Sequence, residues 1–250
     1  MPYVAKLLHT SSGFDYSYAT GTTGTRHVGD AGGHALLWTG TADSYVDLHP
    51  TGFEFSNASD VFENTQVGAG YDPLTGGHAL LWNGTAESVV DLHASGYLHS
   101  DALGVWGGQQ VGVGYTEPGF QGPRALLWNG SAASAVDLHP AGFEFSSAAD
   151  VAGEYQVGSA GSADLGFHAV LWKGTAASVV DLHTFLAMLP IPMITSYAEA
   201  IAENGVIVGR GYDANYNFYA MMWLPVPEPS SCVLFACVLA AALVARRSRR

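Results

Sequence analysis

The body of this sequence has no cysteine and few basic side chains. Its two cysteines, Cys232 and Cys237, both lie in an apolar segment near the C-terminus, so residues 1–224 form no disulfide. The same residues carry 21 acidic and 5 basic side chains, a net charge of −16. Phosphate binding needs a basic surface, so this charge argues against nucleic acid as a partner. The acidity is typical of a soluble exported protein, with weak attraction of divalent cations as the alternative.

The sequence also lacks the short motifs that mark common catalytic sites. It contains no Gly-x-Ser-x-Gly elbow, phosphate-binding loop, His-Glu-x-x-His or Asp-x-Asp-x-Asp-Gly loop. Residues 1–12 likewise lack the basic start and apolar run of an export signal. Because the C-terminal features described below require translocation, we expect that the true start lies upstream or that the sequence is truncated.

What the chain has instead is a regular repeat. His34-Ala35-Leu36-Leu37-Trp38 returns in copies that end at Trp82, Trp128, Trp172 and, more weakly, Trp223, at spacings of 44, 46, 44 and 51 residues. The 31 glycines and the many β-branched and aromatic residues favour short strands joined by tight turns. A period in the forties with four strand-like runs indicates a β-propeller. We therefore predict an all-β, five-bladed β-propeller of four-stranded repeats about 44 residues long.

The fourth repeat shows the expected unit, with strands at 145–152, 155–161, 168–173 and 178–183. The third run is apolar throughout, which predicts an interior strand buried on both faces. The fourth run alternates, so that Val180 and Leu182 should share a buried face. Asn83-Gly84 and Asn129-Gly130 suit a tight hairpin that would pair the third and fourth runs. Glycines such as Gly68, Gly70 and Gly158 should let adjacent sheets approach closely.

The two ends of the repeat region predict how the ring closes. The fifth copy stops at Trp223 without a Val-Asp-Leu-His run, whereas residues 3–9 are a loose version of that run, with Lys6 and one extra residue out of pattern. We expect this N-terminal strand to complete the last blade and remove its free edge. An incomplete larger ring is the alternative. Residues 184–195 form an apolar insertion, a loop or short helix expected to cap one end of the ring.

Acidic and histidine side chains recur in register with the repeat. Asp47 and His49 return in each of the next three copies, two residues apart and therefore on one strand face. We interpret them as structural: the Asp accepts backbone N–H groups and the His packs against or bonds to the adjoining loop. Ligation is the less favoured alternative, because four equivalent pairs around a ring do not converge. We predict no catalytic residue, no metal ligand and no cofactor.

Residues that differ between copies leave two other functions open. Phe53, Phe143, Tyr97 and Tyr115 could line a polar end of the ring and stack on sugar rings, as in a propeller lectin that binds extracellular polysaccharide. A propeller glycosidase would need scattered carboxylates at the channel mouth. The copy-specific candidates, none of which we assign to a site, are His99, Asp101, Trp106, Glu117, Glu199, Glu203 and Asp213.

The repeat core His-Ala-Leu-Leu-Trp, followed by Asp-Leu and preceded by Gln-Val-Gly, resembles the HAF family of bacterial extracellular repeats over nearly all of residues 3–223. That resemblance implies an extracellular location and a repeat architecture, and it supplies no chemistry.

The C-terminal segment, residues 225–250, reads as a separate sorting signal. Pro227-Glu228-Pro229 precedes an apolar stretch, residues 230–245, and four arginines (Arg246, Arg247, Arg249 and Arg250). Sixteen residues of helix are about 24 Å long, somewhat short of a hydrocarbon core of about 30 Å. The arginines would stay in the cytoplasm, which places the body outside it.

These three parts in this order resemble the PEP-CTERM signal of Gram-negative bacteria. The resemblance implies that an exosortase recognises Val226, Pro227, Glu228 and Pro229 and processes the chain, often in cells that export polysaccharide. A plain C-terminal membrane anchor is the alternative. We therefore expect a non-catalytic, exported cell-envelope or extracellular-matrix repeat protein, with a propeller domain at 1–224 that is first anchored in the membrane by residues 230–245.

Overall fold

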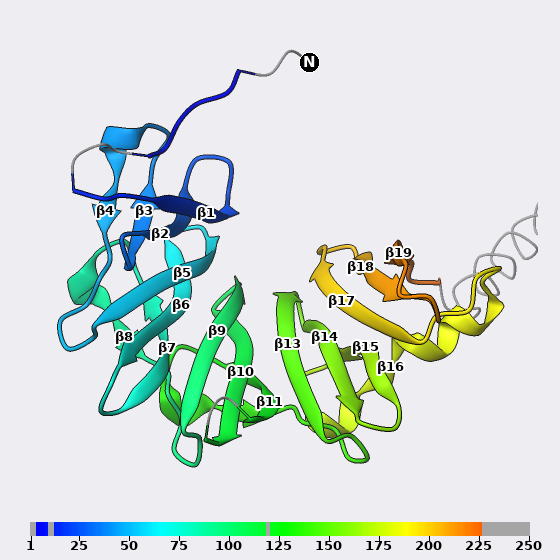
Figure 1. The fold of residues 1–250 in the computed structure, drawn as a ribbon. Coiled ribbons are helices and arrows are strands. Elements are labelled where there is room, and N and C mark those ends of the chain that lie inside the picture. Colours follow the sequence, from blue (N-terminus) through cyan, green and yellow to red (C-terminus); the bar gives the residue numbers. More distant parts are fainter. Residues whose placement is uncertain (1–3, 10–12, 119–120, 227–250) are drawn as a thin grey trace, which may run out of the picture.

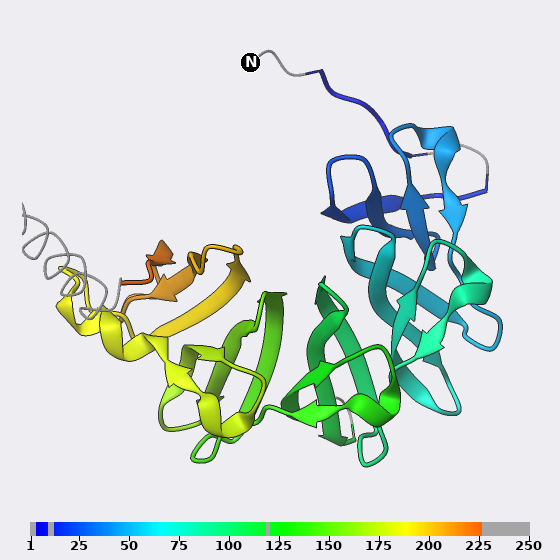
Figure 2. The same ribbon diagram turned by 180° about the vertical axis from the view of Figure 1, so that it is seen from behind.

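The computed structural model describes residues 4–9, 13–118 and 121–226. Within these ranges the chain is all-β, with five antiparallel sheets that follow one another in chain order along an arc (Figures 1 and 2). We call these sheets blades 1 to 5. Five sheet-forming repeats were predicted, and this part of the prediction is confirmed.

Blades 1 to 4 each contain four strands, and blade 5 contains three. The strands are, for blade 1, β1 (Ser17–Thr22), β2 (His27–Ala31), β3 (His34–Trp38) and β4 (Val46–Asp47); for blade 2, β5 (Phe55–Phe62), β6 (Thr65–Asp72), β7 (Gly76–Trp82) and β8 (Val90–Asp91); for blade 3, β9 (His99–Trp106), β10 (Gln109–Glu117), β11 (Gln121–Trp128) and β12 (Val136–Asp137); for blade 4, β13 (Phe145–Ala152), β14 (Tyr155–Ser162), β15 (Gly166–Trp172) and β16 (Val180–Asp181); and for blade 5, β17 (Thr195–Ile201), β18 (Ile207–Tyr212) and β19 (Phe218–Trp223).

The hydrophobic core lies between successive blades. The predicted interior strand is confirmed, because the Ala-Leu-Leu-Trp run of β7 is buried and β7 pairs with β6 on one side and β8 on the other. One core cluster combines Leu37 and Leu48 of blade 1 with Ala58, Leu80 and Trp82 of blade 2. Each sheet is too small to bury both of its faces, so its apolar residues are removed from water by the neighbouring blade.

The fourth strand is much shorter than predicted. It contains only two residues in each of blades 1 to 4, because the chain first forms a 3-10 turn at Ala42–Ser44, Ala86–Ser88, Ala132–Ser134 and Ala176–Ser178. In blade 2 the Ser88 hydroxyl donates to the Thr85 carbonyl at 2.6 Å and accepts the Asn83 N–H at 2.8 Å, which fixes this turn. The predicted pairing with the third strand is confirmed by the partners Leu80 and Asp91. The prediction that Val180 and Leu182 share a buried face is confirmed for Leu182 and wrong for Val180, which is 41% exposed.

Close approach at Gly68 occurs within one sheet, not between sheets as predicted. A Cβ atom at Gly68 would lie 2.0 Å from the Asn57 carbonyl oxygen on the neighbouring strand β5. The cause is a bulge in β5 between Ala58 and Asp60, which pushes the backbone of β5 toward β6. The equivalent glycines meet the same obstacle in the other blades at 1.9 to 2.0 Å: Gly29, Gly112, Gly158 and Gly209.

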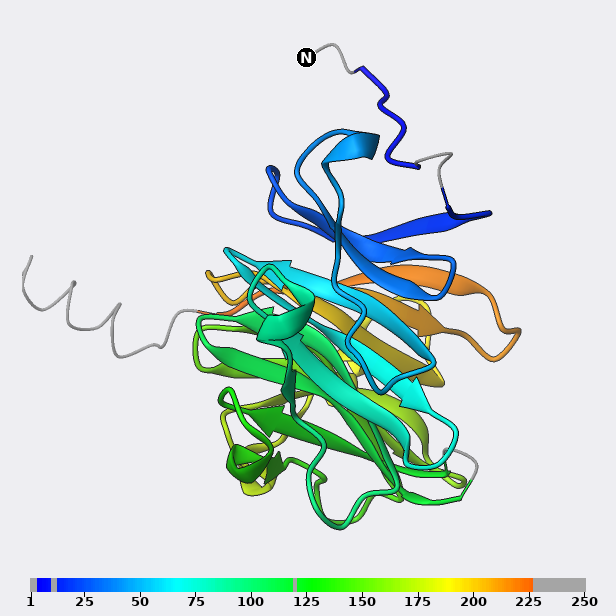
Figure 3. The same ribbon diagram turned by 90° about the vertical axis from the view of Figure 1, so that its left-hand side faces the viewer.

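Among the described residues the five sheets form an open arc and blade 5 has three strands, so the predicted completion of the last blade by the N-terminal strand is not found there. Residues 4–9 form no strand, and Leu8 packs against Ala31, Leu36 and Trp38 of blade 1. In Figure 3 the N-terminal segment lies above blade 1, on the side away from the other blades. The blade junctions share one geometry, which sets the curvature of the arc and leaves blades 1 and 5 at opposite ends (Figure 1).

The insertion before blade 5 contains the 3-10 helix η5 (Leu182–Met188). A loop or a short helix was predicted for residues 184–195, and the structure has the short helix. Its buried residues Leu182 and Leu186 belong to the core cluster between blades 4 and 5. No helix among the described residues is long and apolar enough to cross a membrane. The predicted apolar helix at 230–245 and the four tail arginines lie outside the described residues.

Candidate ligand-binding cleft

The repeated Asp and His side chains form a hydrogen-bond network that joins each blade to the next. At the first junction, Asp47 accepts the His49 backbone N–H at 2.8 Å with one oxygen and pairs with the His34 ring at 2.8 Å with the other. The His49 ring then bonds to Ser56 of blade 2 at 2.8 Å. This serine also accepts the Ala35 N–H of blade 1 at 2.9 Å. The predicted structural role of the Asp–His pairs is therefore confirmed.

The same network recurs at every junction with nearly the same distances. The ring-to-serine distance is 2.8 to 2.9 Å for all four histidines, and the serine accepts a backbone N–H at 2.9 Å each time. Arg124 replaces the first histidine at the third junction and reaches Asp137 at 3.3 Å. The first histidine stacks on the second at the other three junctions, with centroid distances of 4.1 to 4.3 Å.

This arrangement has the residue types of a hydrolase triad without its geometry. The aspartate carboxylate bonds to the backbone N–H of the histidine whose ring meets the serine, and not to that ring. The serine is buried and already holds a backbone N–H. Burial is the first cause that lowers the pKa of His49, His93, His139 and His183, followed at three of them by the charge of the neighbouring histidine and at His139 by that of Arg124. We conclude that the network is interblade structure.

The copy-specific candidates do not form a single cluster. Glu199 pairs with Arg210 within blade 5. Glu203, in the turn that follows β17 of blade 5, accepts a hydrogen bond at 3.3 Å from Trp106, the last residue of β9 in blade 3. Asp213 closes the β18–β19 turn by accepting the backbone N–H groups of Asn215 and Asn217 and the side-chain amide of Asn217. These hydrogen bonds, the Asn217 side-chain bond first, lower the pKa of the Asp213 carboxyl. Glu117 is an exposed residue at the end of β10. Among the described residues, no three His, Cys, Asp or Glu side chains are placed to hold a metal ion.

The aromatic residues expected at a sugar-binding rim contribute to blade packing instead. Phe53 and Phe143 each meet a histidine ring edge-on, His78 at 5.7 Å and His168 at 6.1 Å between centroids. Tyr97 packs against the core cluster between blades 2 and 3. Burial also raises the pKa of Tyr97 to about 12, with the Asp137 charge as the next cause. Tyr115 is partly buried on β10.

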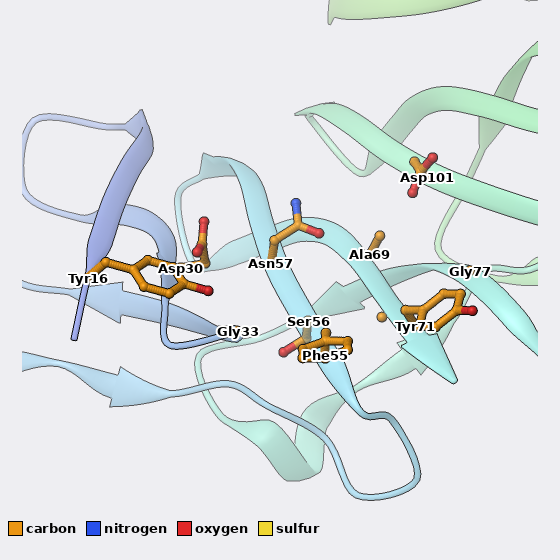
Figure 4. A pocket seen from close by; sticks show the side chains of 11 residues that line it. Tyr16, Asp30, Gly33, Phe55, Ser56, Asn57, Ala69, Tyr71, Gly77 and Asp101 are labelled. Atoms are coloured by element: carbon orange, nitrogen blue, oxygen red, sulfur yellow. The ribbon is translucent and has the colours of Figure 1, made fainter. Parts of the chain in front are cut away.

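One cleft does gather polar and aromatic side chains from three blades (Figure 4). Its volume is about 360 Å³. Besides the junction serine Ser56, its polar and aromatic lining comprises Tyr16 and Asp30 of blade 1, Phe55, Asn57 and Tyr71 of blade 2, and Asp101 of blade 3. Asp101 is therefore the one sequence candidate that the structure places in the cleft, and His99 lies beside it, with its ring accepting the Gly77 N–H at 3.0 Å.

The cleft combines two partly desolvated carboxyl groups with exposed aromatic faces. Burial raises the pKa of Asp30 and of Asp101, and the His99 charge opposes this at Asp101. Tyr16, Phe55 and Tyr71 are 48%, 50% and 39% exposed, so their rings remain available to a ligand. Carboxylate and amide oxygens accept hydrogen bonds from hydroxyl groups, and aromatic faces stack on apolar ring surfaces. The arrangement suits a polyhydroxylated ligand.

Sequence reasoning missed five of these six residues, although the repeat carried a signal. Asn57 and Asp101 occupy the same position of their blades, and the equivalents are Tyr18, Ser147 and Tyr197. Asp30 has the equivalents Ala69, Val113, Ser159 and Arg210. Both positions vary among the copies, and Asp30, Asn57 and Asp101 bring their polar side chains to one cleft.

No family model matches the chain, and no curated protein matches its sequence. Among solved structures, a crystal structure of puromycin hydrolase aligns over 85% of this chain and 39% of its own length. The sequence identity is 14% and the TM-score is 0.43. The present chain thus spans less than half of that protein, and a similarity this low carries no argument about activity.

Val226 is the last described residue and the first of the predicted sorting motif. It is 86% exposed, at the end of a segment that leaves β19. Pro227, Glu228 and Pro229 lie outside the described residues.

Proposed function

We propose that the chain is a non-catalytic, exported repeat protein of a Gram-negative cell envelope or extracellular matrix. In this proposal residues 1–224 are the functional body, and residues 225–250 are a PEP-CTERM-type signal that anchors the chain through residues 230–245 until an exosortase processes it. The HAF-like repeat agrees with an extracellular location. The observation that carries the non-catalytic part is the interblade network, because its Asp, His and Ser groups already bond to one another and to the backbone.

Cell fractionation with mass spectrometry of the mature C-terminus tests this proposal. When the full-length chain is expressed in the host, the mature protein should be recovered outside the cytoplasm, with its C-terminus upstream of residue 230. Pro227→Ala combined with Pro229→Ala should abolish this processing, whereas Pro225→Ala, which alters a neighbouring proline outside the motif, should leave it intact. A full-length C-terminus that persists in the native chain would leave the plain anchor as the better account. Recovery in the cytoplasm would overturn the location.

A second candidate function, binding of extracellular polysaccharide, is favoured by the cleft. Its polar groups come from Asp30, Asn57 and Asp101 on three blades, and Tyr71 offers an exposed ring beside them. This interpretation places saccharide at the junction of blades 1, 2 and 3 and not at the aromatic residues first expected.

Titration with the exopolysaccharide of the host, followed by calorimetry, tests the second candidate. Asp101→Asn and Tyr71→Ala should each weaken binding about tenfold or more, since one charge-assisted hydrogen bond or one stacking ring is worth more than about 1 kcal/mol. Tyr155→Ala removes another exposed tyrosine, on blade 4 and away from the cleft, and should change nothing. Absence of binding at millimolar ligand would eliminate this candidate. Release of reducing sugar during the titration would instead support a glycosidase, which we regard as the least favoured function.

A further inference from the structure

The N-terminal segment, residues 4–9, occupies the place of the last strand of a blade that precedes blade 1. The His9 ring bonds to Ser17 at 3.0 Å, as the His49 ring bonds to Ser56 at 2.8 Å. Leu8 packs on Leu36 and Trp38, as Leu48 does on the equivalent residues of blade 2. The edge contact of Phe14 with His34 likewise repeats the later contact of Phe53 with His78. Half of an interblade junction is therefore already assembled at the start of the arc.

Within the described residues, nothing takes the part of the other half of this junction at blade 1. In blades 1 to 4 the Val-Asp strand pairs with the third strand of its own blade, but residues 4–9 have no such partner among the described residues. Val4 and Leu7 are 84% and 76% exposed as a result.

The complementary half is present at the far end of the arc, in blade 5. Strand β19 pairs with β18 on one side, and no strand of the described chain pairs with its other edge. Met222 stands at the position of Leu37 and is 61% exposed, where Leu37 is 3% exposed. An apolar groove of about 600 Å³ follows this strand, between Leu182, Phe185 and Leu186 of η5 and residues 220–224. An open apolar strand edge is a template for an added strand.

The two ends match in register and in side-chain chemistry. Counting back from the shared histidine, Leu7 takes the place of Asp47 and Lys6 that of Val46. The blade 1 pairs Leu36 with Asp47 and Leu37 with Val46 would then become Met221 with Leu7 and Met222 with Lys6. The residue that pairs with the Asp, a histidine in blades 1, 2 and 4 and Arg124 in blade 3, is replaced in β19 by Tyr219, so both members of the polar pair change to apolar or aromatic residues together. Lys6 falls at a position that is 37% to 41% exposed in blades 1 and 4.

We propose that residues 4–9 of one copy of this chain add to β19 of a second copy as its fourth strand. The pairing cannot form within one chain while the four junctions keep their common geometry, because that geometry holds blades 1 and 5 apart. A second copy meets the requirement without altering any junction. The contact is heterologous, so two or more copies continue the series of blades into a closed ring or an extended array. This inference does not depend on the identity of any ligand.

A disulfide between copies tests the pairing. Directly paired strand residues lie about 4.5 to 5.5 Å apart at Cα, which is within the range that a disulfide spans. In the full-length chain, kept in detergent and with Cys232 and Cys237 changed to serine, Lys6→Cys and Met222→Cys are introduced on separate chains and the two are mixed. Both positions are exposed, so neither substitution disturbs the core. The control mixes Lys6→Cys with Leu74→Cys, which sits in the β6–β7 turn and is 92% exposed.

The expected result is a disulfide-linked heterodimer at least tenfold more abundant than in the control mixture. Equal yields in the two mixtures would overturn the proposal. So would a chain carrying both Lys6→Cys and Met222→Cys that forms its disulfide internally as a monomer, because that result would mean closure by the chain's own segment. Analytical ultracentrifugation of the native chain gives an independent check. Leu7→Glu should lower the average mass, and an unchanged mass would attribute any association to another surface.

Discussion

The His93 ring and the Ser100 hydroxyl lie 2.9 Å apart across the boundary between blades 2 and 3. Ser100 is fully buried, and its hydroxyl oxygen also accepts the Ala79 N–H of blade 2 at 2.9 Å. One serine on the first strand of a blade therefore holds two groups of the preceding blade. Because the bonds recur at each junction, the blades stack in one fixed geometry, and the cleft between blades 1, 2 and 3 inherits that geometry.

Replacing Ser100 with alanine should destabilise the protein by about 1 to 3 kcal/mol, because a buried backbone N–H loses its acceptor. The change should appear as a lower midpoint of urea unfolding monitored by tryptophan fluorescence. Ser95→Ala, in the exposed turn that precedes the same strand, should leave the midpoint within error. Equal midpoints for Ser100→Ala and the native chain would mean that the network contributes no net stability.

The four junction histidines make stability depend on pH. Their pKa values in the folded chain are lowered, mainly by burial, so protonation favours the unfolded chain. The stabilising contribution is fully present above the ordinary histidine pKa of about 6.5 and is lost as pH falls through the lower folded values. Unfolding midpoints measured between pH 7.5 and 5 should fall, and His93→Gln should reduce this slope by about one quarter, as expected for one of four similar sites. Unfolding midpoints that do not change between pH 7.5 and 5 would contradict the lowered pKa values of the junction histidines.

The repeat architecture was predictable because the same residues make the same contacts in every blade. The apolar Ala-Leu-Leu-Trp run predicted the buried third strand, and the number of its copies predicted the number of sheets. The Asp–His pairs could be recognised as structural because they return in every copy. The serine that completes the network was not recognised, although Ser56, Ser100, Ser146 and Ser196 are as regular as the histidines. A single hydroxyl carries too little signal until its partner strand is placed.

The curvature of the arc and the cleft could not be predicted in the same way. The match between residues 3–9 and the missing strand was real, as the His9–Ser17 bond shows, but the sequence did not indicate whether that strand could reach β19. Whether the N-terminal segment reaches β19 depends on the angle between successive blades, and this angle adds up over four junctions. The cleft was not predicted because its polar side chains, Asp30, Asn57 and Asp101, lie at positions where the repeat varies and come together only once three blades are stacked.

Glycine at position 68 is required by the β5 bulge, so Gly68→Ala should be strongly destabilising. The new Cβ would lie 2.0 Å from a backbone oxygen, an obstacle that no side-chain rotation removes. We expect a loss of about 1 to 3 kcal/mol or failure to fold. Gly130→Ala tests the opposite case, because this glycine has φ of 78° and nothing lies within 4 Å of the position that its Cβ would take. It should cost only the backbone preference, about 1 to 2 kcal/mol, and no steric repulsion. Similar losses for the two variants would argue against the steric account.

Asp60 is a carboxylate built into a junction, and its charge should oppose folding. It accepts the Val105 N–H of the next blade at 3.0 Å, and burial followed in part by the Asp150 charge raises its pKa. A raised folded pKa means that the folded chain holds the proton more tightly, so this contribution is present below the ordinary aspartate pKa of about 3.9 and is lost as pH rises through the folded value.

Asp60→Asn keeps an oxygen acceptor for Val105 and removes the titration. The stability of the native chain relative to this variant should therefore be greatest near pH 3.5 and decline toward pH 7. Asp150→Asn should lower the pKa of Asp60 as well, because the Asp150 charge is one of the causes that raise it. Urea unfolding midpoints measure the stability difference between the native chain and Asp60→Asn. NMR titration of the Asp60 carboxyl carbon measures the effect of Asp150→Asn on the pKa, and a pKa of Asp60 at or below about 3.9 in the native chain would contradict the account.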